Sequence, residues 1–234
     1  MPSTSSFKKL KRQENLLFMK QLVKSPKSLG SVMPSSPFLG DFIAGHIHLK
    51  EDEKVLELGP GTGRLTQAML RANIKPEQII VVELDLAMCS FLKDHLPGVT
   101  VIHGDATSLT TLLSKEEAQK IKVIVSGIPM ITIPKDVQDK IVEESFDILK
   151  NVQGYFLQFT YGLTSSIPPK KFGLLAKKLG VVFMNFPPAT VWKYEKTELC
   201  DTLKKGKLST FKVTRRFLSA KTSLYKKKFQ NLTK

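Results

Sequence analysis

Residues 55–63 are the feature of this chain that most constrains its fold. They read Val-Leu-Glu-Leu-Gly-Pro-Gly-Thr-Gly, a short apolar run that leads into glycines at three alternating positions, and a helical pattern follows. Glycine tolerates the backbone angles of a tight turn. Because it has no Cβ, it also lets a ligand approach the backbone and the N-terminus of the following helix. The segment therefore predicts a strand, a ligand-binding turn and a helix in direct succession.

Short β-branched runs alternate with longer amphipathic segments from residue 54 onward, which predicts an α/β fold with a parallel sheet built from strand–helix units. Gly, Pro or acidic residues bound each run. The expected strands are Lys54–Leu58, Ile79–Glu83, Val99–His103, Ile121–Ser126 and Tyr155–Phe159. The expected helices are Gly63–Ala72, Leu86–His95, Ser108–Lys120 and Lys135–Leu149.

Beyond the last of these strands the pattern changes. A proline-containing loop leads to a helix that we expect near Phe172–Leu179. Two β-rich runs follow, Val181–Phe186 and Ala189–Tyr194, and Pro187-Pro188 joins them. Since proline cannot donate to a central ladder, these runs predict an antiparallel hairpin at an edge of the sheet.

Charge is distributed unevenly along the 234 residues, whose formal net charge is +15. Residues 1–30 hold seven Lys or Arg and one acidic residue, and residues 193–234 hold thirteen and three, whereas sixteen and seventeen lie between them. A nearly neutral core with two basic ends points to a polyanionic partner, either nucleic acid or an anionic membrane surface. Both ends also carry apolar side chains at helical spacing, which favours amphipathic segments on a membrane.

Several classes of protein find no support in the sequence. No run approaches the roughly 18 apolar residues that span a bilayer, and the first residues lack the apolar core of a signal peptide, so we expect a cytoplasmic protein. Cys89 and Cys200 are far apart in the chain, and the four histidines have no ligand-like spacing. Neither a disulfide framework nor a metal site is therefore expected.

Acidic residues follow the second and third expected strands. Glu83 comes about twenty residues after the glycine turn, at the spacing where a carboxylate accepts both hydroxyls of a ribose. Asp105 can accept a hydrogen bond from an exocyclic adenine amine, although capping of a helix would also explain it. With Glu57 in the first strand, these acids predict an adenosine-containing ligand. The glycines are spaced GxGxG rather than GxGxxG, which makes a nicotinamide or flavin dinucleotide the lesser alternative.

This combination resembles the class I S-adenosylmethionine-dependent methyltransferases. The resemblance implies a Rossmann-like fold: a seven-stranded, mostly parallel sheet with a C-terminal antiparallel hairpin and helices on both faces. It also implies that the glycines pass under the methionine part of the cofactor, that Glu83 holds the ribose, and that Asp105 and Ala106 meet the adenine. The full set of implied cofactor-binding residues is Glu57, Gly59, Gly61, Gly63, Glu83, Leu84, Asp105, Ala106 and Ser126.

The segment Ser126-Gly-Ile-Pro-Met130 follows the fourth expected strand, where this fold places the loop that faces the methyl acceptor. In the rRNA adenine dimethyltransferases, which are similar through the glycine motif, this loop reads Asn-Leu-Pro-Tyr or close to it. Its amide and its aromatic ring bind the flipped base. Gly127 and Met130 replace both groups here, and about forty residues follow Trp192 where those enzymes carry a helical domain. Both departures count against an RNA acceptor.

From about Phe18 to Tyr194 the chain resembles the bacterial phospholipid N-methyltransferases, which make phosphatidylcholine from phosphatidylethanolamine. The segments that carry this resemblance are Val32-Met-Pro-Ser-Ser36, Glu57-Leu-Gly-Pro-Gly-Thr-Gly63, Gly104-Asp105-Ala106, Ser126-Gly-Ile-Pro129, Gln158-Phe-Thr-Tyr-Gly162 and Asn185-Phe-Pro-Pro-Ala189. The resemblance implies methyl transfer to phosphatidylethanolamine or its mono- and dimethylated forms. It also implies peripheral binding to the inner face of a bacterial cell membrane.

Such a reaction mainly requires that a neutral amine be held in line with the sulfonium methyl while bulk water is excluded. The product becomes a quaternary ammonium, which aromatic faces accommodate well. We therefore expect Phe159 and Tyr161 to form the wall of the acceptor site, with Gly127 and Pro129 in the loop beside it.

These features together predict three parts of the chain. Residues 1–36 form a basic amphipathic helix and a covering segment, residues 37–195 the methyltransferase domain, and residues 196–234 a basic amphipathic arm. One alternative is an RNA adenine N6-dimethyltransferase, which makes nucleic acid the less favoured partner. The other is a non-catalytic membrane-associated module that retains the cofactor crevice.

Overall fold

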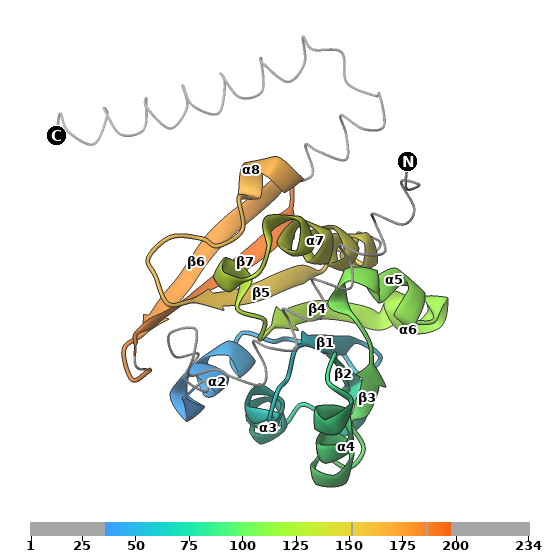
Figure 1. The fold of residues 1–234 in the computed structure, drawn as a ribbon. Helices are drawn as coiled ribbons and strands as arrows, with labels where there is room; N and C mark the ends of the chain where they lie inside the picture. Colours follow the sequence, from blue (N-terminus) through green and yellow to red (C-terminus); the bar gives the residue numbers. More distant parts are fainter. Residues whose placement is uncertain (1–35, 151, 186, 198–234) are drawn as a thin grey trace, which may run out of the picture. The chain divides into compact units, whose positions relative to one another are not determined.

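The computed structural model describes residues 36–150, 152–185 and 187–197, which contain a seven-stranded sheet in the order β3-β2-β1-β4-β5-β7-β6 (Figure 1). The strands are β1 (Lys54–Leu58), β2 (Ile79–Glu83), β3 (Thr100–His103), β4 (Ile121–Ser126), β5 (Tyr155–Thr160), β6 (Leu174–Val182) and β7 (Ala189–Lys196). The α-helices are α2 (Pro37–Ala44), α3 (Arg64–Arg71), α4 (Leu86–His95), α5 (Leu109–Leu112), α6 (Lys115–Lys120), α7 (Lys135–Leu149) and α8 (Pro169–Phe172). Short 3-10 helices are η1 (Pro76–Gln78), η2 (Ala106–Ser108) and η3 (Met130–Thr132).

Strands β1 to β5 run parallel, whereas β7 is antiparallel to both of its neighbours, β5 and β6. The expected fold, a mostly parallel sheet with an antiparallel C-terminal hairpin, is therefore confirmed. Because β6 and β5 both run against β7, they point in the same direction. The carboxyl ends of β1 to β6 consequently lie along one edge of the sheet, which we call the carboxyl edge.

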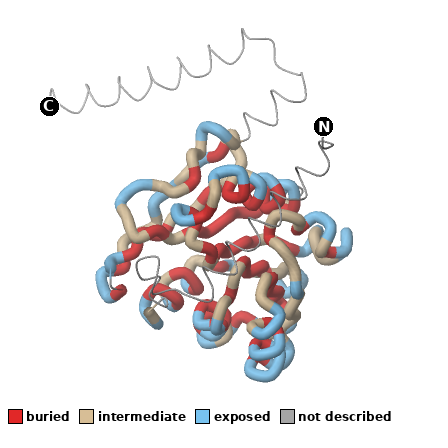
Figure 2. Tube along the Cα trace, viewed as in Figure 1, coloured by how far each residue is buried: buried red, intermediate tan, exposed pale blue. Residues whose placement is uncertain are grey.

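Helices cover both faces of the sheet and enclose two apolar clusters (Figures 1 and 2). Helices α2, α3 and α4 contribute to one cluster, and α5 and α7 contribute to the other. Alternate strand residues point to opposite clusters, so Val55 and Val123 pack on one side while Leu56 and Ile124 pack on the other. This two-sided burial explains why the central strands read as continuous β-branched runs.

One expected helix is divided in two. The prediction of a single helix over Ser108–Lys120 is wrong, because α5 ends at Leu112 and α6 begins at Lys115. The side chain of Ser114 accepts a hydrogen bond from the backbone amide of Glu117 at 3.2 Å and thereby caps α6. A serine followed three residues later by a glutamate is a helix-start signal, and it divides the helical pattern here.

A second correction concerns the segment after β5. The helix expected near Phe172–Leu179 is wrong, because α8 ends at Phe172 and residues 174–182 form β6. Gly173, with a φ of +61°, ends α8 in the left-handed region. The ladder between β6 and β7 begins at Leu174, paired with Lys196, and continues to Val182. The hairpin is thus longer than expected, and its first strand ends before the predicted Phe186.

Several predictions fall outside the described residues. These are the N-terminal amphipathic helix, residues 32–35 of the first resemblance segment, nearly all of the C-terminal arm, and Cys200. Within the described part, Cys89 is buried. No helix there is both long enough and apolar enough to cross a membrane.

Candidate active site

The glycine turn lies at the carboxyl edge, between β1 and α3. Gly59, Gly61 and Gly63 have φ angles of +66°, +56° and +75°, which residues with side chains rarely adopt. Gly63 is the N-cap of α3. A Cβ added to Gly61 would meet no atom within 4 Å, so the backbone at this position is open to a ligand. This cradle suits a cofactor that packs against the turn and against the N-terminus of a helix.

Hydrogen bonds join the strand ends around this turn. The backbone amide of Gly104, after β3, donates to the carbonyl of Glu83 at 2.9 Å. The amide of Gly127, after β4, donates to the carbonyl of Leu58 at 2.8 Å. The loops after β1 to β4 therefore form one connected surface, on which the predicted cofactor residues meet the predicted acceptor loop.

Glu83 ends β2 with its carboxylate fixed against the glycine turn. One carboxylate oxygen accepts from the amide of Gly61 at 3.2 Å, and the other accepts from the amides of Leu84 at 2.8 Å and Asp85 at 2.9 Å. Burial raises the pKa of this carboxyl, and the three backbone hydrogen bonds oppose that shift. The side chain is thus held beside the turn, and its expected role in binding a ribose stays a prediction.

Glu57 lies beneath the turn rather than on its surface. It is 1% exposed, and its carboxylate accepts a hydrogen bond from the hydroxyl of Thr66 on α3 at 2.6 Å. Burial raises the pKa of Glu57 to about 7, the Thr66 hydroxyl opposes this shift, and the negative charge of Glu83 adds to it. Glu57 therefore connects β1 to α3 and is electrostatically coupled to Glu83. Thr66 is a partner that the sequence analysis missed.

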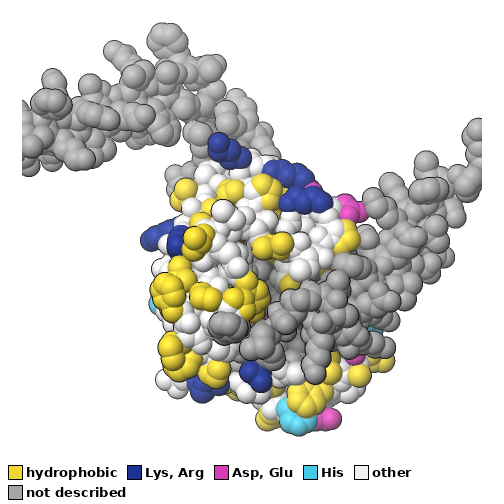
Figure 3. Space-filling view, turned by 60° about the vertical axis from the view of Figure 1, so that its left-hand side comes forward, with side chains coloured by type: hydrophobic (Ala, Val, Ile, Leu, Met, Phe, Trp, Pro, Cys, Tyr) yellow, Lys and Arg dark blue, Asp and Glu magenta, His cyan; other side chains and the backbone are white. Residues whose placement is uncertain are grey.

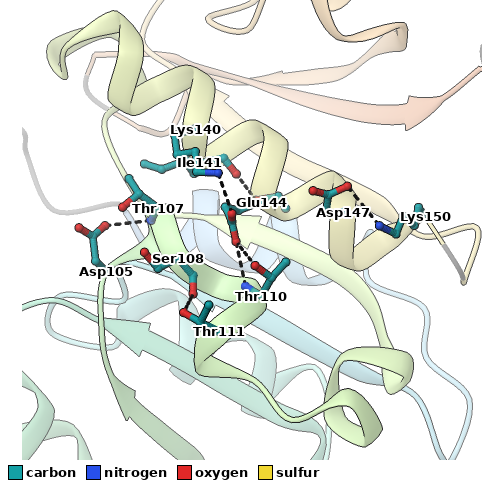
Figure 4. Close-up of polar contacts among 11 residues, drawn as sticks. Asp105, Thr107, Ser108, Thr110, Thr111, Lys140, Ile141, Glu144, Asp147 and Lys150 are labelled. Carbon is teal, nitrogen blue, oxygen red and sulfur yellow. Dashed lines mark hydrogen bonds and ion pairs between the residues drawn. The ribbon is translucent and has the colours of Figure 1, made fainter. Parts of the chain in front are cut away.

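The predicted adenine side of the site is formed by the segment after β3. The Asp105 carboxylate accepts from the amide of Thr107 at 2.9 Å, so it caps η2 (Figure 4). The capping role that the sequence left open for Asp105 is therefore present. The side chain of Ala106 is buried in the apolar core. The ring of His103, at the end of β3, lies 3.1 Å from the carbonyl oxygen of Leu84, which follows β2.

Helix α7 is fastened to this same segment (Figure 4). The Glu144 carboxylate accepts from the amide of Thr110 at 2.9 Å and from its hydroxyl at 2.7 Å, and it pairs with Lys140 at 2.9 Å. Burial raises the pKa of Glu144, but these hydrogen bonds outweigh burial and the pKa is lowered. Because α7 begins just after the acceptor loop, this contact links the two sides of the site.

The acceptor loop has no room for the groups that bind adenine in RNA enzymes. A Cβ on Gly127 would lie 2.6 Å from the carbonyl oxygen of Gly59, so an asparagine cannot occupy this position without a backbone shift. Met130 is 2% exposed and packs in the core instead of presenting a face for stacking. Ser126 is fully buried, and its hydroxyl accepts from the amide of Ile128 at 3.2 Å.

Two buried glutamines hold this loop in place, and neither was predicted as a site residue. Gln158 on β5 donates its side-chain amide to the carbonyl of Ile128 at 3.2 Å. Gln138 on α7 donates to the carbonyl of Met130 at 3.0 Å. For Gln158 the available signal was an uncharged polar residue within an apolar run, since such a residue needs a partner when it is buried. Gln138 lies among charged residues and gave no such signal.

The predicted aromatic wall lies after the acceptor loop, at the end of β5. Phe159 and Tyr161 are both partly exposed and meet edge to face, with 5.8 Å between their ring centroids. Burial raises the pKa of the Tyr161 phenol, and a hydrogen bond with the Asn185 side chain opposes this shift. Asn185 also accepts from the backbone amide of Ser36 at 2.9 Å. It was missed as a site residue, although it lies in a segment that carried the resemblance.

The described residues contain no group of three His, Cys, Asp or Glu side chains placed to hold a metal ion. Two of their histidines, His46 and His95, contact the backbone locally. The rings of His46 and His95 each lie 2.8 Å from a carbonyl oxygen one helical turn earlier, those of Phe42 and Phe91. These contacts account for both rings without a ligand.

Comparison with known proteins places the chain in a family. A family model described as ribosomal RNA adenine dimethylase matches residues 23–156, more than half of the chain. The ornithine lipid N-methyltransferase of Singulisphaera acidiphila is 29% identical over 151 residues, which cover 62% of this chain and 76% of that protein. Ribosomal RNA small subunit methyltransferase A of Chlorobium phaeobacteroides is 30% identical over 128 residues, 55% of this chain but only 45% of that protein.

Solved structures agree on the fold. The precorrin-6y C5,15-methyltransferase from Geobacter metallireducens GS-15 superimposes with a TM-score of 0.50 at 14% identity, over 68% of this chain and 87% of that one. The family match, the fold and the open glycine turn all point to the same cofactor. The chain belongs to the ribosomal RNA adenine dimethylase family and is a class I methyltransferase that uses S-adenosylmethionine.

Proposed function

We propose that this protein methylates the primary amine of a membrane lipid, with phosphatidylethanolamine and its mono- and dimethylated forms as the expected acceptors. The observation that carries the proposal is the closed acceptor loop. The close approach of Gly127 to the Gly59 carbonyl leaves no space for an amide side chain, and Met130 is buried. A flipped adenine would therefore find neither a side-chain acceptor nor a stacking ring at these two positions.

The residues of the site fit this chemistry. S-adenosylmethionine supplies an electrophilic methyl group when bound; the open glycine turn would hold its methionine part, and Glu83 would hold its ribose. The acceptor amine approaches between the acceptor loop and the aromatic wall, where bulk water is excluded. Its nitrogen would bond to the methyl carbon as the carbon–sulfur bond breaks. After the first and second transfers the nitrogen would lose a proton, whereas the third would leave a quaternary ammonium that has no proton to lose. Positioning dominates this reaction, because a neutral amine is already a competent nucleophile.

The aromatic pair also suits the product. Each added methyl removes a hydrogen-bond donor from the amine, so a methylated cation depends increasingly on aromatic faces. Phe159 and Tyr161 provide two such rings at the end of β5, and Asn185 fixes one of them. Similarity to an enzyme named for N-methylation of ornithine lipid supports an amine on a lipid as the acceptor.

The family name and the ribosomal RNA relatives favour a second candidate, N6-methylation of adenine in RNA. The strongly basic ends of the chain suit RNA as well as an anionic membrane. We propose a lipid acceptor, and binding to the inner face of the membrane, because the acceptor loop lacks the amide and the aromatic ring that a base would need.

The test offers both acceptors to the full-length protein. Methyl-labelled S-adenosylmethionine is incubated with liposomes that contain phosphatidylethanolamine, with liposomes that contain ornithine lipid, or with ribosomal RNA. We expect label in the lipid extract, resolved by thin-layer chromatography into mono-, di- and trimethylated products. Label in RNA alone would promote the second candidate. At limiting S-adenosylmethionine, Glu83→Ala should reduce labelling of whichever acceptor is used and serves as the control for cofactor dependence.

A further inference from the structure

Exposed large apolar side chains gather on one half of the carboxyl edge. Five of them are between 54% and 78% exposed, and we call them the apolar rim: Phe38, Ile131, Leu163, Phe183 and Met184. Soluble proteins rarely expose apolar side chains in a group unless the group meets a partner. The apolar rim therefore needs an explanation beyond packing.

The topology places these side chains around the acceptor site. Ile131 lies in the loop after β4, and Leu163 lies in the loop after β5. Phe183 and Met184 lie in the turn after β6. Phe38 lies in the first turn of α2, whose N-cap, Ser36, is hydrogen-bonded to Asn185 in that same β6–β7 turn. The rim thus borders the acceptor loop and the aromatic wall, away from the ends of β2 and β3.

Charge is absent from the loops that carry the rim. Residues 123–134, 154–169 and 179–192 contain no Asp, Glu, Lys or Arg, although these types make up 24% of the chain. Residues 148–194 contain six lysines and no acidic residue. Figure 3 brings this edge forward, and hydrophobic side chains dominate the left-hand part of the view, with Lys and Arg around them and no acidic side chain in view there.

We propose that the apolar rim inserts into the surface of an anionic phospholipid bilayer, so that the acceptor site opens onto the lipid headgroups. This inference rests on the proposed lipid acceptor and names the face that meets the membrane. Apolar side chains bind at the boundary between headgroups and acyl chains, and nearby lysines add attraction to anionic lipids. The loops that carry the rim hold no carboxylate that an anionic surface would repel, and the one acid of α2, Asp41, is paired with Arg71 at 2.7 Å.

The tip of the β6–β7 hairpin is the part of the rim best placed to enter first. Phe183 and Met184 are adjacent and are 78% and 67% exposed. Both lie in a turn outside the ladder, which ends at Val182 paired with Ala189. Replacing them with serine therefore removes apolar area without removing a ladder hydrogen bond or a charge.

Strand β6, which leads into this turn, supplies a matched control. Leu175 is 57% exposed and lies near the start of β6, at the opposite edge of the sheet. The experiment measures flotation of the full-length protein with vesicles of phosphatidylethanolamine and phosphatidylglycerol in 0.5 M salt. At this salt concentration the attraction of the basic ends for the vesicles is largely screened, and apolar insertion remains. The variants are Phe183→Ser with Met184→Ser, and Leu175→Ser.

We expect the double variant to lose at least about tenfold in its vesicle partition coefficient, since two large apolar side chains no longer insert. Leu175→Ser should bind as the wild type does. Calorimetric affinity for S-adenosylmethionine should be unchanged in both variants, which verifies that they are folded. Equal vesicle binding by the wild type and the double variant would overturn the proposal.

Two further measurements separate this inference from its alternatives. Monomeric short-chain phosphatidylethanolamine should still be methylated by the double variant, whereas vesicle lipid should be methylated much more slowly. If vesicle binding falls in the double variant but no lipid is methylated by the wild type, the rim is supported and the proposed acceptor is wrong. If the double substitution instead changes the molecular mass in sedimentation without vesicles, the rim joins two copies of the chain and the membrane assignment is wrong.

Discussion

The backbone amide of Gly61 donates a hydrogen bond to the carboxylate of Glu83 at 3.2 Å. It connects the glycine turn to the end of β2, so the side chain expected to bind the ribose also helps to hold the turn that we expect to bind the methionine part of the cofactor. Loss of this carboxylate should therefore remove a group expected to bind the cofactor and also release the hydrogen bond that holds the glycine turn.

Removal of either acid at the predicted nucleoside site should weaken cofactor binding. Glu83→Ala and Asp105→Ala should each cost about 1.5–3 kcal/mol of S-adenosylmethionine affinity, because each removes a charged hydrogen-bond acceptor. Isothermal titration calorimetry measures this cost. Glu77→Ala, an exposed acid on η1 at the opposite edge, is the control and should bind normally. Wild-type affinity in both acid variants, with the fold intact, would show that the cofactor lies elsewhere.

Glu57 should make the protein less stable as the pH rises. Its pKa is about 7 in the folded protein and 4.5 in the unfolded chain, so between these values the folded state binds more protons. The free energy of unfolding should therefore fall by about 3 kcal/mol from pH 4.5 to pH 7 through this group alone, and then level off.

The variant Glu57→Gln isolates this effect, since glutamine is neutral at every pH and can still accept from Thr66. Denaturant unfolding of both proteins at pH 4.5, 6 and 8 is the measurement. The variant should gain stability relative to the wild type as the pH rises. A difference between the two proteins that stays constant across this range would mean that Glu57 does not titrate as expected.

Tyr161 should matter more for the acceptor than for the cofactor. Tyr161→Ala should impair lipid methylation strongly and leave S-adenosylmethionine affinity nearly unchanged. Because the ring is expected to contact the methylated ammonium, the third methyl transfer should be affected more than the first. Tyr161→Phe keeps the ring and removes the hydrogen bond to Asn185, so it should retain most of the activity. Thin-layer separation of the three products reports these losses. Equal losses at all three steps would assign Tyr161 to positioning alone.

Gly127 should tolerate no side chain. Gly127→Ala should lower the free energy of unfolding by about 1–3 kcal/mol, because its Cβ would overlap the Gly59 carbonyl. Gly162→Ala is the matched control, since the nearest atom to its Cβ would be the Thr160 hydroxyl at 3.6 Å. Chemical denaturation compares the two variants. A Gly127→Ala protein as stable as the control would mean that the loop adapts, and the argument against an adenine acceptor would weaken.

The central strands can be predicted from the sequence to the residue. The expected bounds of β1, β2 and β4 agree with the structure, because parallel strands buried on both faces read as unbroken β-branched runs that end in polar residues or glycine. The same regularity places Glu83, Asp105 and the acceptor loop at one edge. Local sequence is sufficient to predict the bounds of a strand where a buried β-branched run ends directly in a polar residue or glycine.

Strand β6 could not be predicted in this way. Its residues Leu174 to Leu179 read Leu-Leu-Ala-Lys-Lys-Leu, all good helix formers, and no local signal opposes a helix after Gly173. The pairing with β7 decides the outcome, and the partners of Leu174 and Lys178, which are Lys196 and Trp192, lie 22 and 14 residues further along the chain. Long-range pairing overrode local propensity here.

The polar partners within the site were also hidden from the sequence. Gln158 and Asn185 are uncharged residues in apolar stretches, and their roles depend on which carbonyl or hydroxyl the fold brings near them. The bond from Ser36 to Asn185 spans 149 residues. Such partners can be identified only from the folded arrangement of the loops.

The antiparallel course of β7 separates the points where the chain enters and leaves this domain. Ser36 enters beside the β6–β7 turn, whereas β7 runs from Thr190, opposite Thr160, to Glu195, opposite Tyr155, and so leaves at the far edge. Eight extended residues measure roughly 25 Å. One fluorophore beside residue 36 and another beside residue 196 would thus mark opposite edges of the sheet. Their unequal energy transfer to labelled lipids would report how the domain tilts on a membrane.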